Sequence, residues 1–156
     1  MPSEKTLVLF SGGVDSTYTA ARLAASDPAP LLLVTWRVPA MAGVHLSQRT
    51  ARQLQGRFPG RIEHQIRDIR GYVRWLRGGV LDCAADNARY GFHYSWCLGC
   101  KTAMHLQTIR LCEQMGITRV IDGSNLYDTH ALEQRPDVLG FFEDLYRQAG
   151  VTHQSP

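Results

Sequence analysis

Two adjacent glycines, placed between an apolar run and a helical pattern, constrain the fold of this chain more than any other feature. The run Leu7-Val8-Leu9-Phe10 predicts a buried strand, and the loop Ser11-Gly12-Gly13-Val14-Asp15-Ser16-Thr17 follows it directly. Glycine turns sharply without a Cβ clash and lets a ligand approach the backbone closely. The helix expected from about residue 15 presents unpaired N–H groups and the positive end of its dipole to this loop. The loop therefore predicts a phosphate site.

The side chains of the loop suit the same chemistry. Ser11, Ser16 and Thr17 add hydroxyl donors, and Asp15 adds a carboxylate that could hold a metal ion or orient a donor. The spacing is neither that of the P-loop, which requires Gly-Lys-Ser/Thr, nor that of the dinucleotide fingerprint Gly-x-Gly-x-x-Gly. A Gly-Ser turn that joins a strand to a helix and binds nothing is the alternative.

Strand and helix patterns alternate along the rest of the chain. Apolar runs predict further strands over residues 31–36, 61–66 and 117–121. Helical patterns are found at about 15–26, 46–58, 71–90, 97–115 and 138–148. Gly78-Gly79 is expected to interrupt the third of these helices with a bend. This order predicts an α/β fold of three α/β/α layers around a mostly parallel sheet, with ligands beyond the carboxyl ends of the strands.

The apolar residues of these helices predict which helix faces are buried. The residues expected in the core are Val14, Tyr18, Ala21 and Ala24, then Leu46, Ala51, Leu54 and Phe58, and finally Met104, Ile109, Leu111 and Met115. Gly116 is expected to end the helix 97–115. Residues 122–128 then leave the carboxyl end of the strand 117–121, at the same sheet edge as the glycine loop.

Length and charge bound the class of protein. The 156 residues, 44% of them hydrophobic, are most simply a single domain over residues 1–156. No run approaches the roughly 18 apolar residues of a membrane span, so a cytoplasmic location is expected. The net charge is +3, and one arginine-rich stretch predicts either a solvated helix face or a nucleic-acid surface. Its members are Arg49, Arg52, Arg57, Arg61, Arg67, Arg70, Arg74 and Arg77.

Four cysteines in such a chain point to metal or thiol chemistry rather than to disulfides. Cys97 and Cys100 form a Cys-x-x-Cys pair that is expected to open a helix, with Lys101 next to it. Candidates for a further metal ligand are Cys83, His93 and Cys112. Four hypotheses stay open: a [4Fe-4S] cluster, a Zn²⁺ site, reactive thiols whose pKa the helix N-terminus and Lys101 lower, or cysteines without a chemical role. The other histidines, expected at the surface or in hydrogen bonds, are His45, His64, His105, His130 and His153.

The loop from Ser11 to Ser16 resembles the Ser-Gly-Gly-x-Asp-Ser motif of the ATP pyrophosphatase, or PP-loop, superfamily, which has a Rossmann-like fold of the HUP type. The resemblance implies that the loop binds the pyrophosphate part of ATP, with Mg²⁺, and that attack on the α-phosphate gives an adenylated intermediate. It also implies that the end of the second strand lines the adenine pocket. The residues there are Thr35, Trp36 and Arg37.

A second set of motifs is similar to the ATP-dependent sulfur transferases of the lactate racemase cofactor and tRNA thiolation type. These motifs are Cys97-Leu98-Gly99-Cys100-Lys101, Gly123-Ser124-Asn125-Leu126-Tyr127-Asp128, Arg135-Pro136-Asp137 and the residues from Gly150 to Pro156. Tyr127 replaces the first acidic residue of a pair in that family. Members of that family continue beyond the point where this chain ends, so this chain is expected to lack the family's C-terminal segment.

These resemblances imply a set of site residues. Those implied for cofactor binding are Ser11, Gly12, Gly13, Val14, Asp15, Ser16, Thr17, Thr35, Trp36, Arg37, Gly123, Asn125 and Asp128. Those implied for catalysis are Asp15, Ser16, Cys97, Cys100 and Lys101. The candidate metal ligands are Cys83, Cys97 and Cys100.

The predicted function is ATP-dependent adenylation, which converts ATP to AMP and pyrophosphate and activates a carbonyl or carboxylate oxygen for sulfur transfer. The expected partners are ATP, a small-molecule or tRNA substrate and a sulfur donor, and a homo-oligomer is a further option. Two alternatives stay open. One is a nitrogen-transferring relative, similar to the deazaguanine nitrile synthases or the amidotransferases. The other is a nucleotide-binding module without turnover, similar to the universal stress proteins.

Overall fold

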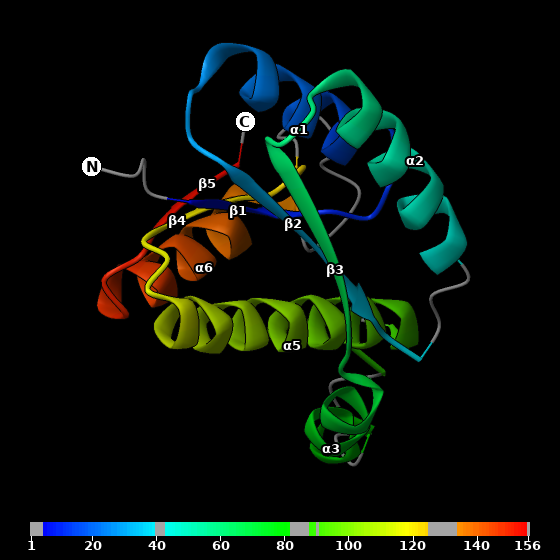
Figure 1. Ribbon diagram of the computed structural model, residues 1–156. Coiled ribbons are helices and arrows are strands. Elements are labelled where there is room, and N and C mark those ends of the chain that lie inside the picture. Colours follow the sequence, from blue (N-terminus) through cyan, green and yellow to red (C-terminus); the bar gives the residue numbers. More distant parts are fainter. Residues whose placement is uncertain (1–4, 40–42, 82–87, 90, 125–133, 156) are drawn as a thin grey trace.

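One sheet of five parallel strands organises the part of the chain that the structure describes (Figure 1). This part of the computed structural model comprises residues 5–39, 43–81, 88–89, 91–124 and 134–155. The strands are β1 (Thr6–Leu9), β2 (Leu31–Arg37), β3 (Ile62–Asp68), β4 (Arg119–Ile121) and β5 (Thr152–Gln154). Their order in the sheet is β3-β2-β1-β4-β5, so β1 lies at the centre, between β2 and β4.

Helices cover both faces of this sheet (Figure 1). On one face lie α1 (Val14–Ser26) and α2 (Val44–Arg57), and on the other lie α5 (Phe92–Met115) and α6 (Pro136–Gln148). The helix α3 (Arg70–Leu81) packs against α5. The predicted three-layer α/β/α fold with a parallel, Rossmann-like sheet is therefore confirmed. No described helix is both long enough and apolar enough to cross a lipid bilayer.

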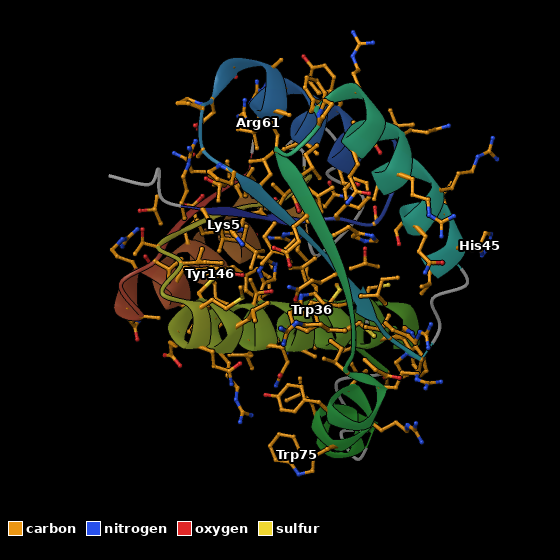
Figure 2. The ribbon with its side chains drawn as sticks, in the orientation of Figure 1. Lys5, Trp36, His45, Arg61, Trp75 and Tyr146 are labelled. Atoms are coloured by element: carbon orange, nitrogen blue, oxygen red, sulfur yellow. The ribbon has the colours of Figure 1, made fainter. Side chains whose placement is uncertain are left out.

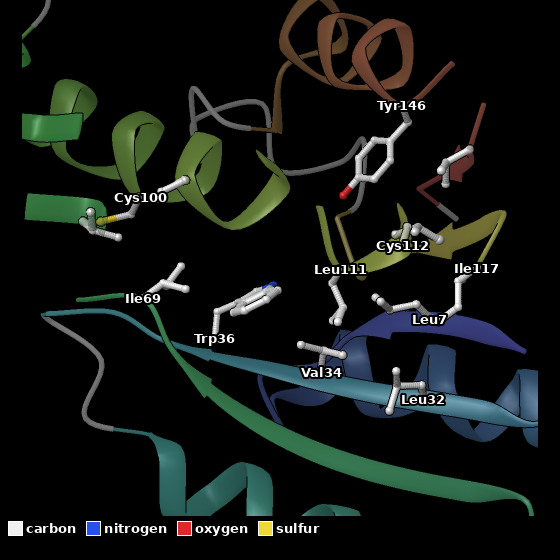
Figure 3. Packing of buried hydrophobic residues seen from close by; sticks show 14 residues of the cluster. Leu7, Leu32, Val34, Trp36, Ile69, Cys100, Leu111, Cys112, Ile117 and Tyr146 are labelled. Atoms are coloured by element: carbon white, nitrogen blue, oxygen red, sulfur yellow. The ribbon is translucent and has the colours of Figure 1, made fainter. Parts of the chain in front are cut away.

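Side chains of the central strands alternate between two cores, one on each face of the sheet. Leu7, Leu32 and Trp36 pack in the layer of α5 and α6, as Figure 3 shows. Val8 and Leu33 pack in the layer of α1 and α2. Successive residues of a strand point to opposite faces, and here both faces are covered. This double burial explains why β1 and β2 are continuous apolar runs in the sequence.

Two helix predictions are wrong. The helix α5 begins at Phe92, after Gly91 with its φ of 83°, and not at Cys97. Cys97 and Cys100 therefore lie inside a helix of 24 residues, so the predicted effect of a helix N-terminus on their pKa has no basis. The helix α3 continues through Gly78-Gly79 to Leu81, without the expected interruption. Each glycine costs an interior helix position only about 1 kcal/mol, which packing against α5 can offset.

The buried face of α1 also differs from the prediction. Val14 and Tyr18 were expected in the core, but they are 84% and 66% exposed. The residues that the helix buries are Ser16, Thr19, Ala20, Leu23 and Ala24. Both sets have helical spacing, so periodicity alone does not distinguish them. The glycine loop sets the phase of the helix, because it turns Ser16 inward at the first turn.

Two further residues predicted in the core lie at the surface. Leu46 in the first turn of α2 is 44% exposed, and Met115 at the last position of α5 is 39% exposed. The predictions for Ala51, Leu54 and Leu111 are confirmed, since all three are buried. Helix ends extend past the apolar surface that the helix middle covers, so the apolar pattern is least informative there.

The sequence pattern did not predict β5. This strand has only three residues, Thr152, His153 and Gln154, none of them aliphatic. It forms by pairing in parallel with β4, with His153 opposite Val120. The pairing places the polar side chain of His153 inside the protein, where it is 6% exposed.

A pair of substitutions tests which face of α1 is buried against the sheet. Leu23→Ala should lower the free energy of unfolding by about 2–5 kcal/mol, because the side chain is buried between α1 and the sheet. Tyr18→Ala on the opposite face should change it by no more than about 0.5 kcal/mol. Urea unfolding followed by circular dichroism measures both. A larger loss for Tyr18→Ala than for Leu23→Ala would contradict the observed orientation.

Candidate functional site

A cavity of about 520 Å³ lies at the carboxyl ends of β1, β2 and β4. The strand order reverses between β1 and β4, and open α/β sheets bind their ligands at such a point. The volume falls within the roughly 300–1,000 Å³ of small-molecule sites. The residues predicted for the site that line this cavity are Ser11, Gly13, Val14, Asp15, Ser16, Trp36, Cys97, Cys100, Lys101 and Gly123.

The glycine loop forms one wall of the cavity. Ser11 Oγ accepts a hydrogen bond from the Gly13 N–H at 3.2 Å and lies 3.1 Å from Ser16 Oγ. Gly13 occupies the cap position of α1 and, having no side chain, cannot cap the helix itself. The first N–H groups of α1 have no acceptor within the helix and lie where an anion would be stabilised. This wall can bind phosphate through backbone donors and hydroxyl groups.

Two glycines allow this wall to pack against its neighbours. Gly12 has a φ of 81°, and a Cβ on it would lie 2.6 Å from Ser47 Cα at the start of α2. Gly123, which follows β4 and Asp122, allows an equally close backbone contact between the chain after β4 and the start of α1. A Cβ on Gly123 would lie 2.8 Å from the backbone nitrogen of Ser16. The backbone of the loop is therefore held between α2 and the chain that leaves β4.

The helix α5 forms the facing wall. Cys97, Cys100 and Lys101 are three and four residues apart, so they share one face of the helix, and all three line the cavity. Cys97 is exposed and Cys100 is buried. Lys101 is 8% exposed, and its Nζ donates a hydrogen bond to Ser124 Oγ at 2.7 Å. The structure thus brings a thiol pair and a cation to the cavity that the glycine loop lines.

Other predicted residues lie elsewhere or outside the described residues. Thr35 is buried, and its Oγ1 donates to the carbonyl oxygen of Phe10 at 2.6 Å and lies 2.9 Å from His64 Nε2. Arg37 is exposed at the end of β2. Of the predicted adenine residues, Trp36 is the one that lines the cavity. The predictions for Cys83, Asn125 and Asp128 fall outside the described residues, and so does His130.

Cys112, a candidate third ligand of the cysteine pair, lies in the core with Leu7 and Tyr146 (Figure 3). Burial raises the pKa of the Cys112 thiol to about 12, and the charge of Glu113 adds to this effect. The thiol therefore stays protonated at neutral pH, and a protonated thiol is neither a metal ligand nor a nucleophile.

The arginine-rich stretch is divided between surface and structural positions. Arg49, Arg52 and Arg57 are exposed on α2. The Arg61 guanidinium instead donates hydrogen bonds to the backbone carbonyl oxygens of Asp27 and Ala29. Arg70 pairs with Asp68 at 2.7 Å, which lowers the pKa of the Asp68 carboxyl to about 2. Some members of the stretch therefore stabilise loops, so it does not act as one uniform surface.

Three buried polar side chains meet beside the cavity, and sequence reasoning missed this group. They are His105 of α5, Asp122 after β4 and His153 of β5, and all are at least nine-tenths buried. Burial lowers the pKa of His105 to about 3, so its imidazole is neutral at pH 7. Burial by itself raises the pKa of Asp122, but the nearby His153, His105 and Lys101 bring it below its ordinary value.

Asp122 also connects this group to the cavity. Its Oδ1 accepts a hydrogen bond from the Ser124 N–H, and its Oδ2 accepts one from Ser124 Oγ, both at 3.0 Å. Ser124 in turn accepts the hydrogen bond from Lys101. The expectation that the histidines lie at the surface or in hydrogen bonds is met by His105, whose Nδ1 lies 3.0 Å from the Tyr146 hydroxyl. It is not met by His153, which is buried and whose ring nitrogens make no hydrogen bond to a described residue. The sequence pattern does not reveal this group, because His105, Asp122 and His153 are 17 and 31 residues apart in the chain and lie on three different elements.

The fold and this cavity define an α/β protein of Rossmann-like topology. No protein-family model and no curated protein matches the chain. Among solved structures it is similar to a protein from Methanocaldococcus jannaschii described as a predicted subunit of tRNA methyltransferase. Their TM-score is 0.62 at 17% sequence identity, over 98% of this chain and 67% of that chain.

The chain is also similar to an NMN synthetase from Francisella tularensis. Their TM-score is 0.53 at 18% identity, over 80% of this chain and 47% of that chain. The matched region thus spans about half of the synthetase. At these identities the two similarities show the shared fold alone.

Substitution of Gly12 tests the close packing of the glycine loop against α2. Gly12→Ala should lower the free energy of unfolding by about 2 kcal/mol or more, because it combines a positive φ with a clash against Ser47. The control is Gly56→Ala inside α2, where a Cβ meets nothing within 4 Å, and it should raise stability by up to about 1 kcal/mol. Urea titration of both variants measures the difference. Equal effects would contradict the close approach.

Proposed function

We propose that this protein is an ATP-dependent adenylating enzyme of the PP-loop type that cleaves ATP between its α- and β-phosphates. The observation that carries the proposal is that the glycine loop and the Cys-x-x-Cys-Lys face of α5 line one cavity. In the proposed reaction a carbonyl or carboxylate oxygen of the substrate attacks the α-phosphorus, and pyrophosphate leaves. A sulfur nucleophile then attacks the activated carbon, and AMP leaves.

The phosphate end of ATP is assigned to the loop from Ser11 to Thr17. The unpaired backbone N–H groups at the start of α1 and the hydroxyls of Ser11 and Ser16, which line the cavity, can donate to the pyrophosphate as negative charge grows on it, which is where preorganised donors accelerate a reaction most. Asp15 offers the oxygen ligand that Mg²⁺ prefers, and it lines the cavity beside the loop. Asp15 is thus the described residue that would hold the ion, which would neutralise phosphate charge.

The base end of ATP is assigned to the apolar part of the cavity. Trp36 and Met104 line it, together with Val34 and Trp96. Trp36 is held in place by the hydrogen bond that its Nε1 donates to Thr108 Oγ1 at 2.9 Å. Aromatic and sulfur-containing side chains make favourable contacts with a planar ring. An adenine in this position would leave the phosphates directed toward the loop.

The second half-reaction is assigned to the α5 wall. The Cys97 and Cys100 thiols line the same cavity as the loop, and their presence there supports sulfur over nitrogen transfer. The ammonium group of Lys101, positioned by Ser124, can stabilise negative charge on the departing AMP. A [4Fe-4S] cluster or Zn²⁺ on the cysteine pair remains a prediction, because two thiolates need further ligands and Cys83 is not described.

Release of pyrophosphate tests the proposed activity. The protein is incubated with ATP, Mg²⁺ and candidate substrates, namely small carboxylates and tRNA, each with sulfide or with ammonia. Asp15→Ala should reduce release at least about 100-fold, because the loop loses its metal-binding carboxylate. The control is Asp144→Ala, which removes an exposed carboxylate on α6 paired with Arg147 and should leave the rate unchanged.

Three outcomes of this assay decide between the alternatives. Full turnover by Asp15→Ala would refute the assignment of the loop. Product formation with ammonia but not with sulfide would favour the nitrogen-transferring relative. ATP binding without pyrophosphate release from any substrate would favour a nucleotide-binding module without turnover.

The cysteine pair can be tested separately. Cys97→Ser and Cys100→Ser should leave ATP affinity unchanged and abolish product formation, because the thiols act only after adenylation. A structural zinc site would instead make both variants lower the melting temperature. Isothermal titration with a non-hydrolysable ATP analogue, together with a thermal melt, separates these results. Anaerobic purification followed by an absorbance scan and metal analysis detects a cluster.

A further inference from the structure

His105, Asp122 and His153 come from three parts of the chain, and one polar atom of each lies close to the other two. His153 Nε2 lies 3.4 Å from Asp122 Oδ2, and His105 Nε2 lies 4.0 Å from the same oxygen. One ligand atom from each residue falls within 4.8 Å of the other two. The side chains are nearly inaccessible to solvent, with exposed fractions of 1%, 4% and 6%.

Three of the four imidazole nitrogens of this group make no hydrogen bond to a described residue. They are His105 Nε2 and both ring nitrogens of His153, and all three are buried. Buried polar atoms in folded proteins are almost always satisfied, so three such nitrogens in one place need an explanation. The carboxylate of Asp122, which lies between the two rings, cannot make hydrogen bonds to all three of these nitrogens.

We propose that His105, Asp122 and His153 form a binding site for one divalent transition-metal ion, with Zn²⁺ as the preferred ion. Two imidazole nitrogens and one carboxylate oxygen suit zinc and its first-row neighbours, whereas Mg²⁺ and Ca²⁺ prefer oxygen alone. A tetrahedral ion with bonds of about 2.0–2.1 Å separates its ligand atoms by about 3.4 Å. Asp122 Oδ2 and His153 Nε2 already have this separation, whereas His105 Nε2, at 4.0 Å from Asp122 Oδ2, has to move inward.

The surroundings of the three residues orient them for such an ion. His105 Nδ1 lies 3.0 Å from the Tyr146 hydroxyl, and donation from Nδ1 to that oxygen leaves Nε2 as the metal-binding atom. Outer-shell hydrogen bonds of this kind fix the tautomer of a ligating histidine. The ring of His153 stacks on Tyr146 at 4.5 Å and 10°. Asp122 is held by its two hydrogen bonds from Ser124.

The site differs from both metal positions discussed above. It shares no residue with the cysteine pair or with Asp15, and it does not depend on ATP binding. His105 and Asp122 also line the cavity, so an ion held by three protein ligands would keep a position open toward it. Three protein ligands with an open position are typical of catalytic rather than structural zinc sites. This position would accept water or a substrate oxygen.

Metal binding is measured on the full chain carrying Cys97→Ser and Cys100→Ser, because these thiols could bind the same ions. After chelator treatment, the protein is titrated with Zn²⁺ and, separately, with Co²⁺. We expect one equivalent of zinc per chain after desalting. At a hundredfold excess over Kd the melting temperature should rise by about 5–10 °C. The cobalt complex should show visible absorption bands without the thiolate-to-cobalt charge-transfer band.

The matched variants replace one histidine each. His153→Phe keeps the ring that stacks on Tyr146 but removes both nitrogens, so the affinity should fall by more than the roughly 100-fold typical for loss of an outer-shell partner. His45→Phe, at the exposed start of α2, is the control and should bind as tightly as the parent (Figure 2). If His153→Phe does not fold, as judged by circular dichroism, Asp122→Asn takes its place.

Two results would overturn the proposal. The first is a chelated parent chain that binds neither Zn²⁺ nor Co²⁺. The second is a folded His153→Phe or Asp122→Asn variant that binds zinc as tightly as the parent. Either result would leave the three residues as a buried polar network, even if the pyrophosphate assay succeeds. Conversely, loss of zinc binding in these variants would support the site even if ATP is not cleaved.

Discussion

Close approach of backbone to backbone around the end of β1 is the constraint on which the rest of the structure depends. Gly12 touches the start of α2, and Gly123 touches the start of α1, at distances that leave no room for a Cβ. These two contacts hold the glycine loop, the first turn of α1 and the exit of β4 in one arrangement. The N-terminus of α1 is consequently aimed into the cavity, and the burial of Ser16 follows from the same geometry.

The cavity combines two walls of different chemical character. The loop wall offers hydrogen-bond donors for an anion, while the α5 wall offers two thiols and the ammonium group of Lys101. Helical spacing places these three groups on one face of α5, and the hydrogen bond with Ser124 links that face to the residues after β4. A ligand that reaches from one wall to the other would contact residues far apart in the sequence. The proposed reaction between a nucleotide and a second substrate is based on this arrangement of the two walls.

A polar network extends from the cavity into an otherwise apolar layer. Asp122 is its centre, since it accepts hydrogen bonds from Ser124 on the cavity side and faces His105 and His153 on the inner side. His105 continues the network to the Tyr146 hydroxyl. Buried polar groups are costly unless they are satisfied, so such a network persists only where its members are precisely placed or bind a ligand. The aromatic rings around it provide the placement, with His105 stacked on Phe142 at 4.1 Å.

The strands β1 to β4, the glycine loop and the α/β class could be predicted from the sequence, because each depends on local patterns of apolar and small residues. The resemblance of its motifs also implied site residues in the loop and in the Cys-x-x-Cys motif, and the structure places both on the cavity. Tertiary structure decided the rest. The glycine loop, and not the apolar residues of α1, decides which face of that helix is buried. The helix α5 begins after Gly91 and not at Cys97. The strand β5 exists only because β4 offers it a partner, and through it His153 reaches Asp122. Contacts of this kind join residues with no fixed spacing in the chain, so packing alone brings them together.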